Sequence, residues 1–340
     1  MMTVAVRWQP LLKWLVAIGL LVLVLLWIDP EALLAQFATL HPGWLGLALL
    51  VGALQIVLSA GRWWYTARQL GLRLSFRRAV ADYFLSTLVN QVVPGGVMGD
   101  VARGLRHGVR LSTSGRQYGA AIRAVMLERL SGQLVLLPLL AVLLLATVSG
   151  RQVADTLLQM AGEQLPILGA LLILVLAMAA ALKRLRLPAL KRLGTVLRED
   201  AGRALLRWPV VVWQGLSSLA VVGSYLLLFL LCARALGVST PALTLLPLIP
   251  LVLLGMLVPF TVSGWGVREG VAALLWPLAG LPAAEGVALS MLYGVLILLS
   301  SLPGLLTVLG ETLAQSKERS NSVSGPSSKR RKSGRSASSS

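Results

Sequence analysis

Residues 210–231 read VVVWQGLSSLAVVGSYLLLFLL, a run of 22 residues without a charged side chain. A helix of about 20 apolar residues crosses the hydrocarbon layer of a membrane, which is roughly 30 Å thick. The rest of the chain has the same character. Of its 340 residues, 56% are hydrophobic and only 13% are charged, whereas soluble domains carry about a quarter charged residues. The sequence therefore predicts an all-α polytopic membrane protein.

Five further runs are long and apolar enough to span the membrane. The run at residues 11–28 is longer than the core of an ordinary signal peptide, and the chain stays apolar after it. We therefore expect an uncleaved first span there. Together the runs predict about six full spans, at residues 11–28, 43–60, 130–148, 165–182, 210–231 and 285–310.

The basic residues predict how the spans are oriented. The chain has 31 Lys and Arg against 13 Asp and Glu, and its formal net charge is +18. These basic residues lie in the loops and the tail and not on one soluble domain, so we do not expect nucleic-acid binding. Short loops rich in Lys and Arg stay in the cytoplasm. We therefore expect both termini in the cytoplasm, with membrane lipids and the anionic cytoplasmic leaflet as partners.

This orientation requires two more apolar segments, 79–98 and 244–277, to return to the side from which they enter. Both contain the Pro and Gly residues that a turn at membrane depth needs. Irregular backbone is tolerated at that depth where protein buries it or water lines it. We expect two re-entrant helical hairpins. An ordinary helix hairpin with a proline kink is the alternative for each.

The two hairpin segments resemble each other. The first reads Asn90-Gln-Val-Val-Pro-Gly-Gly-Val-Met-Gly-Asp-Val-Ala-Arg103, and the second reads Pro259-Phe-Thr-Val-Ser-Gly-Trp-Gly-Val-Arg-Glu-Gly270. Each is an apolar run, a proline, a glycine-rich turn, then an acid and an arginine, and one full span follows each. Because they enter from opposite sides, we predict an inverted repeat of residues 79–148 and 243–310. In transporters this design places the substrate site near the midplane.

Four charged residues of the hairpins are candidates for a phosphate site. The glycines leave backbone amides free, and a helix that starts after the turn points its positive end there. A charge at the membrane centre costs about 2.5–3.5 kcal/mol, so each charge needs a partner. Arg268 and Glu269 are adjacent and face different sides of a helix. We therefore predict that Arg103 pairs with Glu269. Arg268 would then pair with Asp100. Ion pairs that only lock the hairpins are the alternative.

Other features have structural interpretations. Arg62-Trp63-Trp64-Tyr65 is typical of a snorkelling cation in an aromatic belt. Glu128-Arg129 is either part of the site or an interfacial pair at the start of a span. Residues 183–207 place Leu and Ala at helical spacing among basic residues, which predicts an amphipathic helix on the cytoplasmic leaflet. Residues 313–340 are rich in Ser, Lys and Arg and are predicted to be a disordered basic tail.

No cofactor or metal is expected. Cys232 is the only cysteine, and His41 and His107 lack the spacing of a zinc motif. The sequence also lacks the glycine-rich loop of nucleotide-hydrolysing proteins. Transport by this chain is therefore expected to be passive or coupled to an ion.

The motifs resemble the transmembrane region of lysylphosphatidylglycerol synthases and its stand-alone flippase-like relatives. The similarity covers residues 10–312. It rests on Arg62-Trp63, the motif from Asn90 to Arg103, Glu128-Arg129 and Gly264-x-Gly-Val-Arg-Glu269, in that order. The resemblance implies a flippase-like domain at residues 1–312 in a bacterial inner (plasma) membrane, where bifunctional relatives move an aminoacylated phospholipid outward. The chain ends about 30 residues after the last span. We therefore expect neither a synthase domain nor lysyl transfer.

The expected function is a flippase or transporter that moves an anionic or aminoacylated phospholipid or glycolipid headgroup. A membrane enzyme that modifies headgroups, with Asp100, Glu128 or Glu269 as its acid–base group, is one alternative. A scaffold is another, with a separate glycosyltransferase or synthase as the candidate partner. The expected substrate-binding residues are Asn90, Pro94, Gly95, Gly96, Gly99, Asp100, Arg103, Glu128, Arg129, Gly264, Gly266, Arg268 and Glu269.

Overall fold

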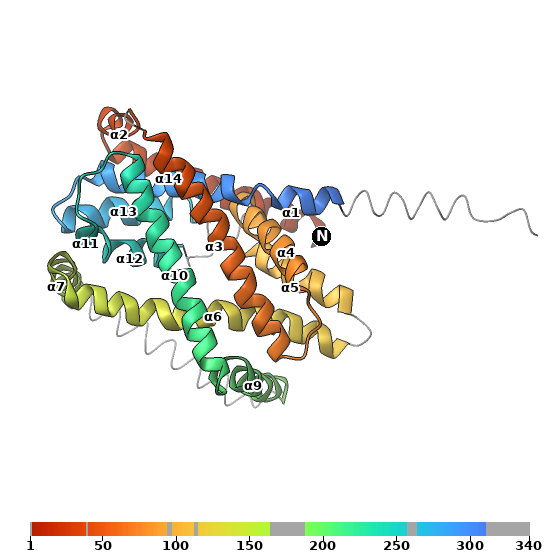
Figure 1. Ribbon diagram of the computed structural model, residues 1–340. Helices are drawn as coiled ribbons and strands as arrows, with labels where there is room; N and C mark the ends of the chain where they lie inside the picture. The colour runs from red at the N-terminus through yellow and green to blue at the C-terminus, as the bar shows by residue number, and fades with distance from the viewer. Residues whose placement is uncertain are drawn as a thin grey trace, which may run out of the picture.

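The computed structural model describes residues 2–38, 40–93, 97–111, 115–163, 188–256 and 264–310. In these ranges the regular elements are all helical (Figure 1). They are α1 (Met2–Trp27), α2 (Pro30–Gln36), α3 (Pro42–Gln69), α4 (Phe76–Val92), α5 (Met98–Leu111), α6 (Gly115–Ala146), α7 (Val148–Glu163), α9 (Pro188–Ala201), a π-helical turn (Gly202–Leu206), α10 (Val210–Ala235), α11 (Ala242–Leu245), α12 (Leu248–Gly255), α13 (Val267–Leu278) and α14 (Ala283–Ser301).

Among the residues that the structure describes, four helical segments are long and apolar enough to cross a membrane, and they coincide with four of the predicted spans. They are Pro42–Gln69, Gln117–Ala146, Val210–Ala235 and Ala283–Gly310. A fifth candidate consists of the end of α1 together with α2, which is bent by 99° relative to α1. The predicted span at residues 165–182 lies outside the described residues, as does the predicted tail at 313–340. Six spans therefore stay a prediction.

The bend after α1 has a local cause. The Asp29 side chain accepts a hydrogen bond from the backbone N–H of Glu31 at 3.0 Å, and Pro30 occupies the first turn of α2. A capping Asp followed by Pro is a standard helix start. The chain therefore begins a new helix there instead of extending α1.

The predicted hairpin segment 244–277 contains the packed helices α12 and α13, whereas the segment 79–98 contains most of α4 and ends where α5 begins. The helices α4 and α5 pack on each other, as do α12 and α13. In the first pair, the backbone N–H of Gly99 donates to Asn90 Oδ1 at 2.7 Å, and Arg110 Nη1 lies 2.6 Å from Asp82 Oδ2. The turn residues 94–96 and 257–263 lie outside the described residues. Whether the pairs are re-entrant, and whether they form an inverted repeat, stays a prediction.

Two glycines shape the start of the second pair's second helix. Gly264 has φ +79° and Gly266 has φ +85°, and L side chains rarely adopt such angles. A methyl group at Gly266 would also lie 2.7 Å from Leu20 Cβ on α1. The conformation that only glycine adopts freely thus lets α13 begin close against the first helix.

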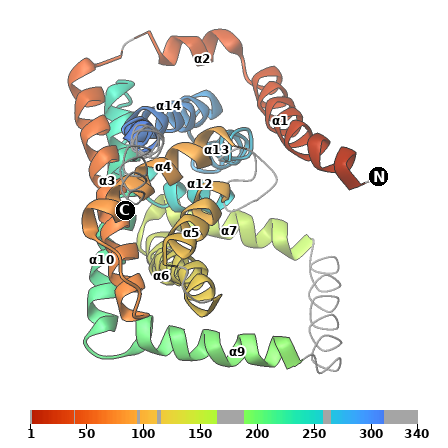
Figure 2. The same cartoon turned by 90° about the vertical axis from the view of Figure 1, so that its right-hand side faces the viewer.

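The helices enclose a hydrophobic core and a smaller group of buried polar residues, and their outer surface is apolar. α3 and α10 run side by side along one edge, and the helix pairs lie between them and α1 (Figure 2). The main hydrophobic core joins α10, α12, α13 and α14 around Phe229, Trp276 and Tyr293. Large apolar side chains such as Leu50 and Leu216 are exposed on the outside. This distribution suits a helix bundle that faces lipid.

The predicted amphipathic segment is partly described. Residues from Pro188 form α9 and the π-helical turn, and both pack against α6, with Leu127 in its first half contacting Ala204 and Leu205. Arg123 Nε on α6 donates to Asp200 Oδ2 at 2.5 Å. The segment is thus tied to the bundle, and its contact with a lipid leaflet stays a prediction.

Candidate functional site

Five charged side chains from three helices meet inside the bundle, and we name them the arginine–carboxylate cluster: Arg62, Asp100, Arg103, Glu128 and Arg129. Glu128 joins two arginines. Its Oε1 lies 2.5 Å from Arg62 Nη2, and its Oε2 lies 3.2 Å from Arg103 Nη2. Asp100 also joins two. Its Oδ1 lies 2.7 Å from Arg103 Nη2, and its Oδ2 forms an ion pair with Arg129. The cluster is therefore one connected network.

The cluster carries one net positive charge because three guanidinium groups face two carboxylates. Taking charges out of water is costly unless each is paired and hydrogen-bonded. Here each carboxylate contacts two arginines, so both acids have cationic partners. The Arg129 side chain is 41% exposed, whereas the other four are almost fully buried. Arg129 is thus the member most open to an incoming group.

Neighbouring polar groups fix Asp100 and Glu128 in place. Asn90 Nδ2 donates to Asp100 Oδ2 at 2.9 Å, and the Ser86 hydroxyl donates to Oδ1 at 3.3 Å. The Tyr83 hydroxyl donates to Glu128 Oε1 at 3.3 Å. These contacts all come from α4, so the first helix of the first pair orients both carboxylates.

Arg103 is held by aromatic rings as well as by acids. Its guanidinium carbon lies 4.5 Å from the centroid of the Trp63 ring and 4.0 Å from that of Tyr83. A guanidinium above an aromatic face is attracted by the ring quadrupole. This explains how Arg103 Nε and Nη1 are tolerated although they are buried without a hydrogen-bond partner.

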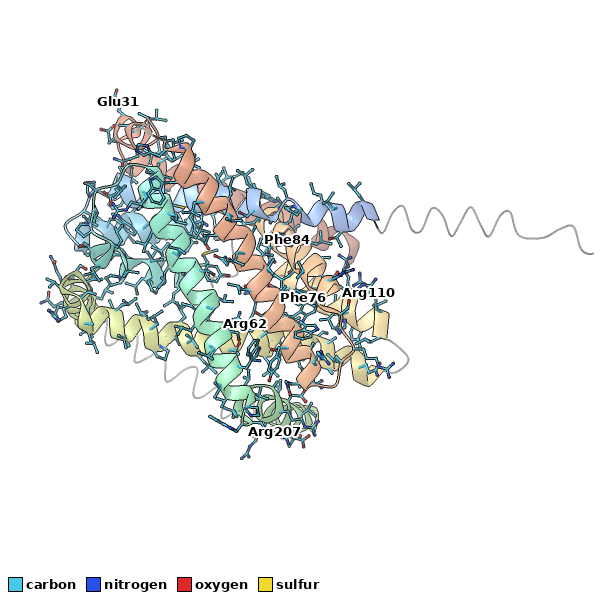
Figure 3. All side chains as sticks on the ribbon, in the orientation of Figure 1. Glu31, Arg62, Phe76, Phe84, Arg110 and Arg207 are labelled. Atoms are coloured by element: carbon cyan, nitrogen blue, oxygen red, sulfur yellow. The ribbon has the colours of Figure 1, made fainter. Side chains whose placement is uncertain are left out.

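A cavity of about 200 Å³ adjoins the cluster and is bordered by both helix pairs. Arg62 lies in the interior where α3 meets α10 (Figure 3), and its Nη1 donates to Ser218 Oγ at 3.3 Å. Leu253 and Met256 bring the end of α12 to the cavity. The polar residues that line it are Gln55, Ser59, Arg62, Tyr83, Thr87, Asn90, Gln91, Asp100, Glu128, Arg129, Gln133, Tyr225 and Tyr293.

The charged residues of the second helix pair form a buried ion pair with no net charge. Arg268 Nη2 lies 2.7 Å from Glu269 Oε1, and both side chains are 0% exposed. The Ser290 hydroxyl accepts from Arg268 Nε at 2.7 Å and donates to Glu269 at 3.0 Å. Glu269 Oε2 also accepts from the backbone N–H of Gly266 at 2.7 Å, which caps α13. Neither Arg268 nor Glu269 lines the cavity.

The match to a known family spans most of the chain. The family model described as the lysylphosphatidylglycerol synthase TM region matches residues 14–304. The chain belongs to this family. No curated protein and no solved structure matches the chain. Membership of the lysylphosphatidylglycerol synthase TM region family, together with the spanning helices, establishes a multi-pass membrane protein connected with the handling of lipid headgroups.

In this family member the predicted site residues separate into two groups. The structure brings Asn90, Gly99, Asp100, Arg103, Glu128 and Arg129 together around the cluster, and Gly264, Gly266, Arg268 and Glu269 at the start of α13. Pro94, Gly95 and Gly96 lie outside the described residues.

The predicted pairing across the repeat is wrong. Arg103 contacts Asp100 and Glu128, not Glu269, and Arg268 contacts Glu269, not Asp100. Adjacent residues on a helix point to different faces, but an arginine side chain is long enough to fold back to its neighbour's carboxylate. Arg103 and Arg268 are therefore both neutralised within their own helix pair or by the adjoining span.

Sequence reasoning missed the cavity residues on α3, which include Gln55, Ser59 and Arg62. Arg62 was interpreted as a snorkelling cation, but it is buried and bound to Glu128. Gln55 also lines the cavity. The sequence contained a sign of this role. Gln55 and Arg62 are polar residues of a spanning helix, and because they are seven residues apart they lie on one face of it. Polar groups within a membrane segment mark functional sites by default.

Within the described residues, no group of three or more His, Cys, Asp or Glu side chains could hold a metal ion. Glu269 and the two cluster acids contact arginines or backbone amides. Cys232 is fully buried on α10. The polar interior is thus described by arginine, carboxylate, amide and hydroxyl chemistry.

Proposed function

We propose that this protein is a lipid flippase that passes a phosphate-bearing headgroup through the cavity between its two helix pairs. The observation that carries the proposal is the net positive cluster, which borders a cavity inside an apolar helix bundle. Buried charges in a membrane segment are costly and are retained where they serve a pathway or a ligand. A phosphate group would supply the negative charge that the cluster lacks.

Only the arginines that line the cavity can contact a phosphate bound in it. Arg62 and Arg129 line it, whereas Arg103 lies behind them against Trp63 and Tyr83. A guanidinium offers paired N–H donors that match phosphate oxygens. Arg62 and Arg129 would therefore bind the phosphate while Arg103 positions the acids. The acyl chains would stay in lipid during the passage.

For a bacterial inner membrane, as the family resemblance implies, the charged residues at the two ends of the molecule support an orientation with the basic end in the cytoplasm. Glu31 on α2 and Arg207 beside α9 lie at opposite ends of the molecule (Figure 3). Basic loops stay in the cytoplasm, so the end with Arg207 would face inward. In this orientation the helix pairs would lie between the two aqueous sides.

The test is lipid translocation in reconstituted vesicles. Lipids with a fluorescent group on one acyl chain would be scored by a membrane-impermeant reductant, which bleaches only the outer leaflet. We expect bleaching to pass the half-way level with the wild-type protein. Arg129→Ala should slow translocation at least about tenfold, which corresponds to about 1.4 kcal/mol of lost stabilisation.

Arg203→Ala is the matched control because Arg203 is 63% exposed and its partner Glu199 is also at the surface. It should translocate lipid like the wild type. Bleaching that stops half-way with each lipid tested would reject a flippase. Appearance of a modified lipid in detergent would favour a headgroup-modifying enzyme instead.

A further inference from the structure

We propose that the cavity selects a phospholipid whose headgroup beyond the phosphate is uncharged and bears hydroxyl groups, and that it disfavours a headgroup with a cationic amine. The inference rests on the proposed function, since it names the lipid class for the same cavity. The family resemblance does not distinguish an uncharged headgroup from an aminoacylated one. The proposal does, because an aminoacylated headgroup is cationic.

The first argument is that the carboxylates of the cavity already have partners. A cationic amine in a buried site needs a carboxylate with free capacity. Among the described residues, Asp100 and Glu128 are the acids that line the cavity. Each already contacts two arginines, and each accepts a further hydrogen bond from α4. An amine would compete with guanidinium groups for these oxygens.

The second argument is the sign of the charge. The arginine–carboxylate cluster carries one net positive charge, and like charges at short range repel strongly where water is scarce. A phosphate neutralises that excess. In a headgroup that carries both a phosphate and one or more amines, the amines would restore the net positive charge in the cavity. An uncharged headgroup leaves the loaded cavity close to neutral.

The third argument is a pair of amide oxygens without hydrogen-bond partners. Gln55 and Gln91 line the cavity, their residues are 4% and 6% exposed, and Oε1 of each is buried without a hydrogen-bond partner. An unsatisfied buried polar atom is costly, so a ligand that satisfies it is favoured. A hydroxyl both donates and accepts, so it can pair with either end of a glutamine amide.

The fourth argument is size. Gln55 and Arg62 are seven residues apart on α3, which is roughly 10 Å along the helix axis. A phosphate at Arg62 thus leaves room for a short polyol to reach Gln55. The volume of about 200 Å³ is below the range of about 300–1,000 Å³ that drug-sized ligands occupy. The cavity therefore suits a headgroup and excludes the acyl chains.

The experiment compares two lipids that differ only in the headgroup. Full-length protein is reconstituted in phosphatidylcholine vesicles with a trace of acyl-labelled phosphatidylglycerol or of acyl-labelled lysylphosphatidylglycerol. We expect phosphatidylglycerol to translocate at least about tenfold faster. Gln55→Leu should reduce that rate about fivefold or more, since the hydroxyl loses its partner. Gln152→Leu is the matched control because Gln152 is exposed on α7, outside the cavity.

Gln55→Glu is the sharpest variant because it adds a carboxylate at the far end of the cavity, about 10 Å along α3 from Arg62. It should reverse the preference toward the lysyl lipid. Gln91→Glu provides the same test if the first variant does not give a monodisperse protein in detergent. Equal or faster translocation of the lysyl lipid by the wild type would overturn the inference and leave the flippase function standing.

A binding measurement separates the two proposals. Short-chain versions of both lipids are added to the detergent-solubilised protein, and the shift in melting temperature is recorded. If neither lipid translocates but the glycerol lipid still stabilises the protein more, the flippase proposal fails and the headgroup selectivity holds. Greater stabilisation by the lysyl lipid would overturn the selectivity.

Discussion

The two helix pairs have similar sequence motifs but different electrostatic environments. Asp100 and Arg103 of the first pair join arginines and an acid from α3 and α6, and the resulting cluster borders a cavity. Arg268 and Glu269 of the second pair contact each other, and neither lines that cavity. The comparison teaches that a charged motif becomes a site through what neighbouring helices add to it. We expect the first pair to bind the headgroup and the second pair to stabilise the fold.

The largest expected effect is at Glu128, which links two arginines. Glu128→Gln removes the charge that Arg62 and Arg103 share. Arg62 is then left buried without its carboxylate partner, and Arg103 keeps Asp100. We expect a loss of stability toward the upper end of about 3–5 kcal/mol. The measurement is thermal unfolding in detergent. Glu199→Gln, at an exposed pair, should change little. Equal melting temperatures for the Glu128 variant and the wild type would contradict the network.

A smaller effect is expected in the second pair. Arg268→Leu strands Glu269, but Ser290 and the Gly266 N–H still donate to that carboxylate. The loss should fall toward the lower end of about 3–5 kcal/mol. The double variant Arg268→Leu with Glu269→Gln removes both charges and keeps an acceptor for the helix cap. It should recover most of the stability. A double variant as unstable as the single one would show that the pair is not self-contained.

The smallest expected effect concerns the glycine that starts α13. Gly266→Ala places a side chain at φ +85° and against Leu20, so we expect a loss of about 1–3 kcal/mol. Gly223→Ala on α10 is the control because a methyl group there meets nothing within 4 Å. Thermal unfolding of both variants provides the measurement. An unchanged melting temperature for Gly266→Ala would mean that α13 does not depend on its contact with α1.

The motif residues were visible in the sequence because buried charges and clustered glycines are rare in apolar segments. Asp100, Arg103 and Glu128 were therefore predicted site candidates, and the structure brings them together. Arg62 was missed because an arginine beside tryptophans has the same sequence signature at a membrane surface as in an interior. The pairing was predicted wrongly because a repeat suggests symmetry, whereas side-chain reach favours the nearest acid.

The sequence by itself determined that this is a helical membrane protein, placed four of the spanning helices and marked the charged turns. Those properties follow from apolar length and from the cost of charge in lipid, which act residue by residue. Only the tertiary structure decided which charges share a network and which of them face a cavity. That outcome depends on how α3, α5 and α6 pack. The approach of Arg62 to Glu128, 66 positions away in the sequence, is a property of the packing and not of either segment.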